Sequence, residues 1–257
     1  MIDIGANLTN RVFDSDRDAI MERAARAGVK ACIVTGTCVR TSRAAAKLCD
    51  SDHTKTLWFT SGVHPHNAKQ CNSGTIRALR ELAAHPQCVA IGECGLDFNR
   101  DFSPRPIQEQ WFQAQIDLAK ELGKPLFLHC RDAEARFKAI LGSGKLSGVV
   151  QCFTGRQEDL DAYLHAGLHI GITGWVADER RGQGLARLLP RIPADRLLIE
   201  TDCPYLTPRT VPNGPRRNEP SLLPYVLAAV AKARSEAPET TAAQTTANAR
   251  RLFGITL

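Results

Sequence analysis

Four short apolar segments of the sequence each end in side chains that could bind a metal ion. The residues that follow these segments are His64 and His66, Glu93 and Asp97, His129 with Arg131 and Asp132, and Glu200 with Asp202. Imidazole and carboxylate groups together are ligands for Zn, Mn, Fe or Mg, whereas thiolate-rich sites favour iron–sulfur clusters or structural zinc. One histidine after a strand is more often structural than a ligand, but four polar clusters around one cavity would be costly without a balancing cation or water. The pattern therefore indicates a divalent metal site.

Nine cysteines occur along the chain, and no two of them form a C-x-x-C pair. Because several lie within apolar runs, we expect buried free thiols in a reducing compartment rather than a disulfide framework. Cys94, Cys130 and Cys152 each adjoin a candidate site residue. Side chains alternate along a strand, so we expect these three thiols to point away from the site and into the core.

The overall charge excludes little. The chain has 33 Lys and Arg against 27 Asp and Glu, a net charge of +6, which suits a polyanionic substrate and an ordinary protein surface equally well. The sequence contains neither a G-x-x-x-x-G-K-[ST] phosphate loop nor a G-x-S-x-G nucleophile elbow. It shows no signal-peptide pattern and no long apolar run, so we expect a cytoplasmic protein without a membrane span.

The elements that must position these side chains are eight apolar segments alternating with helical ones. The predicted strands are 2–4, 30–34, 57–63, 89–91, 125–128, 149–150, 169–172 and 197–199. The predicted helices are 14–27, 40–49, 75–84, 106–122, 133–141, 158–166, 184–189, 222–233 and 240–252. This alternation is typical of βαβ units and a parallel sheet.

We therefore predict an α/β fold, a TIM-type (β/α)8 barrel that forms a single domain over residues 1–257. A doubly wound open sheet is the alternative. In a barrel, the C-terminal ends of all strands converge on one face, and that face carries the active site. The four polar clusters would then meet in space although they are distant in sequence.

Several motifs occur in an order that resembles a known family. The motifs are IDIGANLT, GVHPH, AIGECGLDFNRDFSP, FLHCRDA, CFTG, IGITGW, LLIETDCPYL and RRNEP. In this order they resemble the TatD family of metal-dependent deoxyribonucleases over essentially the whole chain. The resemblance implies an amidohydrolase-like barrel and divalent-metal-dependent 3′→5′ exonuclease activity on single-stranded DNA or RNA. It also implies a role in repairing oxidatively damaged DNA, and we expect a monomer.

The resemblance also implies roles for individual residues. Glu93 and His129 match metal ligands, and Asp202 matches an aspartate at the metal that accepts a proton from the attacking water. We predict Asp202 and Glu93 as catalytic residues. The predicted metal ligands are Glu93, His129, Gln151 and Asp202, with Mg²⁺ favoured over Mn²⁺ or Zn²⁺. The predicted substrate-binding residues are His64, His66, Arg131, Arg217, Asn218 and Glu219.

The sequence departs from the family pattern at two places. Many members begin D-x-H-x-H, where the two histidines bind a second metal, but here the segment reads Asp3-Ile4-Gly5-Ala6-Asn7. We therefore expect one metal ion, or one tightly and one weakly bound. The family's HCF-[ST]-G motif reads Gln151-Cys152-Phe153-Thr154-Gly155 here, so a neutral amide replaces a ligand imidazole. This change bears on metal affinity and rate, not on the fold.

Two other functions remain open from the sequence. One is a barrel hydrolase of a small ester, lactone or amide, because one fold hosts many chemistries. The other is a weakly active or inactive nucleic-acid binder, which Gln151 would favour. Residues 203–218 carry Arg209, Arg216 and Arg217 and no acidic residue, so this segment would suit contacts with backbone phosphates.

Overall fold

The computed structural model describes all 257 residues and contains one sheet of eight parallel strands in sequence order. The strands are β1 Ile2–Ala6, β2 Ala31–Val34, β3 Leu57–Ser61, β4 Cys88–Asp97, β5 Leu126–Arg131, β6 Gly148–Val150, β7 His169–Ile172 and β8 Leu197–Ile199. After β8, the backbone N–H of Asp202 donates to Gly5 O at 2.8 Å, and that of Asn7 donates to Cys203 O at 2.9 Å. These bonds join the last strand to the first, so the TIM-type barrel is confirmed and the open sheet is wrong.

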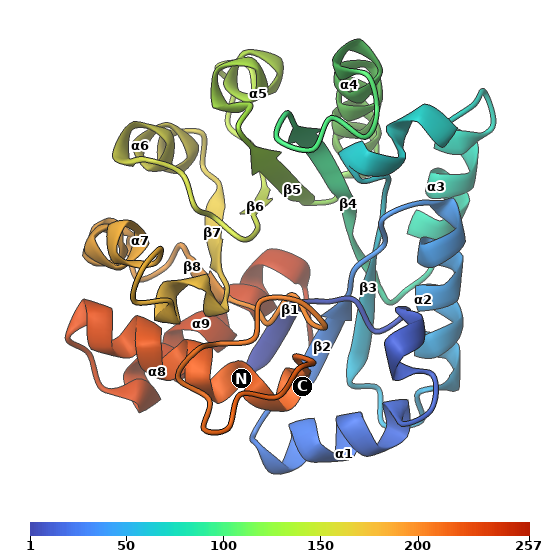
Figure 1. Cartoon of the computed structure of the whole chain (residues 1–257). Helices are drawn as coiled ribbons and strands as arrows, with labels where there is room; N and C mark the ends of the chain where they lie inside the picture. The colour runs from blue at the N-terminus through green and yellow to red at the C-terminus, as the bar shows by residue number, and fades with distance from the viewer.

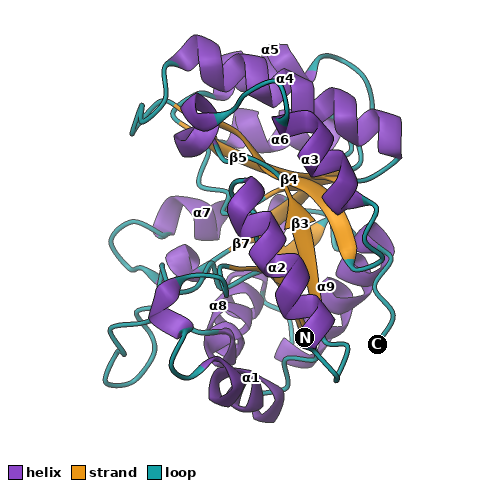
Figure 2. Cartoon of the chain, turned by 90° about the vertical axis from the view of Figure 1, so that its right-hand side faces the viewer, coloured by secondary structure: helices purple, strands orange, loops and turns teal.

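Helices surround the barrel on its outside (Figures 1 and 2). They are α1 Arg17–Arg26, α2 Val39–Ser51, α3 Thr75–Ala83, α4 Arg105–Leu122, α5 Glu134–Leu141, α6 Gln157–His165, α7 Gln183–Leu188, α8 Leu223–Arg234 and α9 Pro238–Phe253. Every predicted helix is present, because each has an apolar face that the barrel can bury. None of them combines the length and hydrophobicity that a membrane span needs.

Strand β4 is much longer than the predicted segment 89–91. It continues through the GECGLD motif because two glycines let it lie close to β5. A side chain at Gly92 would collide with the carbonyl of Phe127, and one at Gly95 with the carbonyl of His129. Both glycines also have positive φ angles, 143° and 145°, which other residues rarely adopt. The extension carries Glu93 and Asp97 to the end of the barrel.

Two apolar cores lie on the two sides of the strands. The larger, of 47 buried residues, packs the strands against the surrounding helices. The smaller, of 12 buried residues, fills the barrel interior and joins residues such as Ile2 and Ile33 to Phe253 of α9. Helix α9 therefore closes the end of the barrel where the strands begin, and the opposite end remains for polar residues.

Alternation along the strands carries polar side chains onto the inward face. Phe127, Val149 and Leu198 belong to the interior core. Residues two positions later on a strand point to the same face. Here those residues are His129, Gln151 and Glu200.

Candidate metal centre

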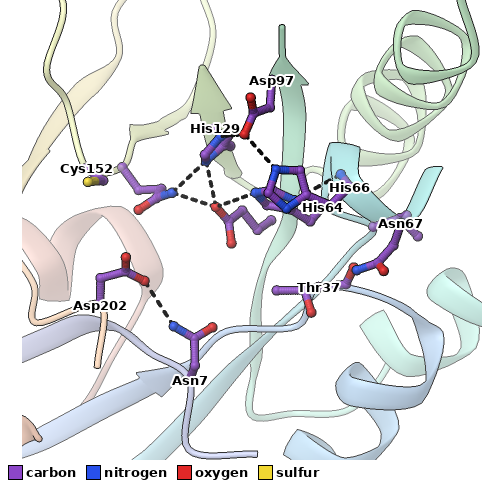
Figure 3. A network of polar contacts seen from close by, with 12 residues as sticks. Asn7, Thr37, His64, His66, Asn67, Asp97, His129, Cys152 and Asp202 are labelled. Carbon is purple, nitrogen blue, oxygen red and sulfur yellow. Dashed lines mark hydrogen bonds and ion pairs between the residues drawn. The ribbon is translucent and has the colours of Figure 1, made fainter. Parts of the chain in front are cut away.

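A cavity of about 1000 Å³ opens at the C-terminal ends of the strands. It brings together seven of the predicted site residues, several of which Figure 3 shows. They are His64, His66, Glu93, His129, Arg131, Gln151 and Asp202. We refer to this cavity as the mouth.

Glu93, on β4, makes the central contacts in the mouth. Its Oε1 accepts a hydrogen bond from Gln151 Nε2 at 2.5 Å and lies 3.1 Å from His129 Nδ1. Gln151 Nε2 and His129 Nδ1 are themselves 3.1 Å apart. Burial opposes ionisation of His129, but the nearby carboxylates of Asp97 and Glu93 outweigh burial and raise its pKa to about 9. Position 151 thus faces the Glu93–His129 pair directly.

His64 approaches the same carboxylate from the start of the 3-10 helix η2 (Pro65–Gln70). Its Nδ1 accepts the backbone N–H of His66 at 3.1 Å, so the neutral ring carries its proton on Nε2. That Nε2 lies 3.6 Å from Glu93 Oε1. Burial lowers the pKa of His64 to about 3, which keeps the ring neutral. His64, Glu93 and His129 each offer a ligand atom, and these atoms lie within 4.8 Å of one another.

Asp97, the last residue of β4, belongs to the site, although the sequence predicted no specific role for it among the polar residues that follow the strands. Its Oδ2 lies 2.6 Å from His66 Nε2 and 3.6 Å from His129 Nε2. Its Oδ1 accepts the backbone N–H groups of Asn99 and Arg100 at 3.0 and 2.8 Å. Burial opposes ionisation, but the neighbouring His129 and His66 rings hold the pKa of Asp97 well below its usual range. Asp97 therefore holds the His66 ring directly and lies next to the His129 ring. Its position at the end of the GLD motif was the sequence feature that could have indicated a role for it.

Asp202 also lines the mouth, where it lies beside Asn7 (Figure 3), and it is not one of the three clustered residues. Its Oδ1 accepts a hydrogen bond from Asn7 Nδ2 at 3.0 Å. Burial and, next, the charge of Glu93 raise the pKa of Asp202 to about 8. A carboxyl group with such a pKa can hold or release a proton near neutral pH.

Two more buried carboxyl groups, those of Glu200 and Asp3, lie near Asp202, and the sequence predicted no specific role for either. Glu200 Oε1 accepts the backbone N–H of Cys152 at 2.6 Å, while its Oε2 has no hydrogen-bond partner. Burial, with the charge of Asp202 adding to it, raises the pKa of Glu200 well above its usual value. Asp3 accepts the backbone N–H of Thr201 at 2.9 Å, and burial raises its pKa to about 6. Glu200 was already among the polar residues expected after the last strand, and alternation from Leu198 places its side chain on the inward face.

This donor set fits a divalent metal ion. Imidazole and carboxylate ligand atoms lie together in a buried cavity, next to an unpartnered carboxylate oxygen of Glu200. A divalent cation would relieve the cost that burial imposes on these acids. Gln151 could present its amide oxygen after rotation of the amide, but a neutral oxygen is a poorer ligand for zinc than imidazole.

The arginines of the segment 203–218 are largely occupied by acidic partners. Arg209 Nε lies 2.8 Å from Asp178 Oδ2. Arg217 forms a bidentate contact with Asp16, with a shortest distance of 2.6 Å. Neither arginine lines the mouth. Arg216 is exposed. The binding of Arg217 to substrate therefore stays a prediction without a contact that places it there.

The neighbouring Asn218 and Glu219 also lie outside the lining of the mouth. Asn218 is buried, and its Nδ2 donates to the carbonyls of Thr201 and Tyr205 at 2.9 and 2.6 Å. Glu219 forms an ion pair with Arg23 at 2.6 Å. These contacts anchor the segment that follows β8, and substrate binding by either residue likewise stays a prediction.

The cysteines near the site lie only partly as expected. All nine are free, and Cys94 is buried in the larger core. Cys130 packs partly against that core and also borders the mouth. Cys152 lines the mouth, so its predicted core position is wrong. Strand β6 ends at Val150, and the φ angle of 45° at Cys152 shows that strand alternation no longer applies there.

Known proteins share both this sequence and this fold. A family model described as TatD related DNase matches residues 2–254. The chain belongs to the TatD-related DNase family. The resemblance that the motifs predicted is therefore confirmed.

Individual members of the TatD-related family match along the whole chain. A protein named 3'-5' ssDNA/RNA exonuclease TatD from Rahnella sp. is 52% identical over 260 residues, which cover 99% of this chain and 98% of that protein. A protein of the same name from Citrobacter rodentium is 51% identical over 262 residues, covering 100% and 99%. The crystal structure of a TatD homologue from Escherichia coli has a TM-score of 0.91 at 26% identity, covering 100% and 98%.

Proposed function

We propose that this protein is a metal-dependent nuclease that hydrolyses phosphodiester bonds from the 3′ end of single-stranded DNA or RNA. The observation that carries the proposal is the buried Glu93–His129 pair facing Asp202 across the mouth. Relatives about half identical to this chain are named as exonucleases of this specificity. Their names support the substrate class, and the mouth supports hydrolysis that depends on a metal ion.

We assign Glu93, His129 and Asp202 as the residues that would hold the ion, with Gln151 beside them. We expect Mg²⁺, with Mn²⁺ or Zn²⁺ as alternatives. When bound, such an ion lowers the pKa of a water molecule and polarises a phosphoryl oxygen. Both effects favour attack on the phosphodiester.

Asp202 acts as the general base. Asn7 holds its Oδ1 at 3.0 Å, which leaves Oδ2 free for the attacking water. As the water oxygen bonds to phosphorus, its proton passes to Asp202 and the bond to the departing ester oxygen breaks. The proton on Asp202 is then available to that leaving oxygen. General-base catalysis of this kind contributes about 10²- to 10⁴-fold.

Three other residues suit contacts with the phosphate. His64 carries its proton on Nε2 beside Glu93, and Asp97 orients His66. Arg131 is exposed at the end of β5 and lines the mouth. A planar guanidinium can donate two parallel hydrogen bonds to a phosphate, which positions the scissile bond.

A weakly active nucleic-acid binder is the second candidate, and Gln151 is the observation that favours it. Its amide donates to Glu93 Oε1 at 2.5 Å, so it competes with a cation for the same carboxylate. Measured turnover at saturating metal separates the two candidates. A rate equal to that without enzyme would leave only the binder.

The main experiment uses oligonucleotides labelled at the 5′ end, with the 3′ end free or blocked, after exhaustive treatment with chelator. Chelator should abolish cleavage, and Mg²⁺ or Mn²⁺ should restore it. The ladder should shorten from the free 3′ end and stop at a blocked one. Full activity without metal would overturn the mechanism. Equal cleavage of circular strands would indicate an endonuclease, and faster hydrolysis of small esters would indicate a small-molecule hydrolase.

We also propose that the enzyme is a cytoplasmic monomer and, from the family resemblance, that it takes part in repair of oxidatively damaged DNA. Sedimentation should give a mass near 28.1 kDa. A strain lacking the protein should be more sensitive to peroxide, and Asp202→Asn should fail to complement it.

A further inference from the structure

A second cavity, of about 680 Å³, lies beside the mouth over the start of α2 and α3. The two cavities share four lining residues, Thr37, Arg40, Thr41 and Asn67. Asn67 Nδ2 donates to Thr37 O at 3.0 Å, and Figure 3 shows these two residues beside the histidines of the mouth. The cavities therefore meet at a common rim. We call the second cavity the α2–α3 groove.

Three exposed arginines, Arg40, Arg43 and Arg77, border the α2–α3 groove. No acidic side chain lies within 4.0 Å of their guanidinium groups. Glu81 is the one acidic residue of the lining. The groove is therefore a positively charged continuation of the mouth.

The rest of the lining has the chemistry of a backbone-binding surface. Gln70, Asn72 and Thr75 contribute amide and hydroxyl groups, and the lining has no aromatic residue. Contacts with phosphates come from arginine, amide and hydroxyl groups and carry no sequence information, whereas unpaired bases commonly stack on aromatic rings. This composition favours a nucleic-acid backbone over bases.

We propose that the α2–α3 groove binds the phosphates of the single strand whose 3′ end occupies the mouth. The proposal rests on the nuclease function proposed above and adds the path of the strand. Arg40 lies on the common rim and receives the strand as it leaves the mouth, and Arg43 and Arg77 contact phosphates further toward the 5′ end. Free guanidinium groups are required for this, because a guanidinium already paired with a carboxylate gains little from a phosphate.

This path predicts that the length of the single strand affects how tightly the enzyme binds it. On this path we expect a dinucleotide to occupy the mouth alone, and a longer strand to reach Arg43 and Arg77, which line only the groove. Each phosphate contact to a single strand contributes about 0.7 to the slope of log affinity against log salt, or about fivefold in affinity at roughly 0.1 M salt. Loss of two contacts should therefore lower the slope by about 1.4 and the affinity by roughly 25-fold.

The test compares R43Q/R77Q with the matched control K47Q/R187Q. Lys47 lies one turn after Arg43 on α2, Arg187 lies on α7, both are exposed, and neither lines the groove or the mouth. Both double variants remove two positive charges. Binding of an oligonucleotide of about 12 nucleotides, a length within the range of single-strand binding sites, is measured by fluorescence anisotropy in chelator over a range of salt. Dinucleotide hydrolysis is measured with metal present.

We expect R43Q/R77Q to lose affinity and salt dependence for the long strand while it hydrolyses the dinucleotide at the parent rate. The control K47Q/R187Q should keep most of its affinity for the long strand and most of the slope of log affinity against log salt. If R43Q/R77Q and the control behave alike while the parent cleaves oligonucleotides, the groove proposal is overturned and the nuclease proposal stands. If the parent cleaves neither substrate, the nuclease proposal fails first.

Discussion

The two ends of the barrel bury opposite kinds of side chain. At the end where the strands begin, Ile2, Ile33 and Phe253 form an apolar plug. At the mouth, Glu93 and Asp202 are largely withdrawn from solvent. Apolar burial stabilises by about 25 cal/mol per Å², whereas burial of an acid costs free energy unless a charge compensates it. Stability should therefore reside at the plug and activity at the mouth.

The largest expected effect comes from Asp202→Asn at the mouth. The amide cannot accept the proton of the attacking water, so kcat should fall by about 10²- to 10⁴-fold. Removal of a buried acid should leave the melting temperature unchanged or raised. Parallel kinetics and calorimetry check both expectations, and a variant that unfolds would place Asp202 among the stabilising residues instead.

Phe253→Ala at the plug should show the reverse. Phe253 is 6% exposed within the interior core, and truncation of a buried Phe to Ala typically costs about 3–5 kcal/mol. The free energy of unfolding, from urea titration, should fall by that amount while kcat stays near the parent value in the protein that remains folded. Phe253→Leu, which keeps more of the volume, serves as the control and should lose less. A large drop in kcat with unchanged stability would contradict the separation.

Gln151→His tests the ligand set of the mouth. Gln151 lies against Glu93 and His129, so an imidazole there should tighten metal binding. Changes around metal ligands alter affinity by about 10- to 100-fold, and calorimetric titration with Mn²⁺ measures this. Gln183→His, on an exposed position of α7, controls for unspecific binding by an added histidine. Equal affinities of Gln151→His and the parent would mean that position 151 does not serve the ion.

The smallest expected effect is the pH dependence of the free energy of unfolding that arises at the plug end. His169 begins β7, is 5% exposed, and neither ring nitrogen has a hydrogen-bond partner. Burial, with the charge of Arg196, lowers its pKa from 6.5 to about 4. The unfolded chain therefore binds more protons between these values, so stability present above pH 6.5 is lost as the pH falls toward 4.

The loss between about pH 7 and about pH 5 should be on the order of 2 kcal/mol for His169 alone. His169→Leu should abolish this component in urea titrations. Asp202 has the opposite sign, because its raised pKa of about 8 makes the folded state lose stability as the pH rises. This loss falls between about pH 4 and about pH 8, so in chelator Asp202→Asn should flatten that part of the profile. Identical acid sensitivity of His169→Leu and the parent would contradict the assignment.

Much of the mouth was predictable because its residues follow strands at fixed local positions. His129 comes directly after the apolar run of β5, and Gln151 directly after β6. Glu200 was equally accessible through alternation from Leu198. The full length of β4 was not, because its polar and glycine-rich sequence resembles a loop until β5 lies against it.

The sequence by itself determined the order of the elements, the apolar faces and the family motifs, because periodicity and spacing are local properties. Only the tertiary structure decided which charges are free. Arg217, which was predicted to contact substrate, donates hydrogen bonds from its guanidinium to Asp16, 201 positions away in the sequence. Arg43 and Arg77 belong to no motif, yet they line the α2–α3 groove, whose lining contains only one acidic residue, Glu81. The availability of a charge depends on which distant segments the fold brings within a few ångströms, and no local pattern records that distance.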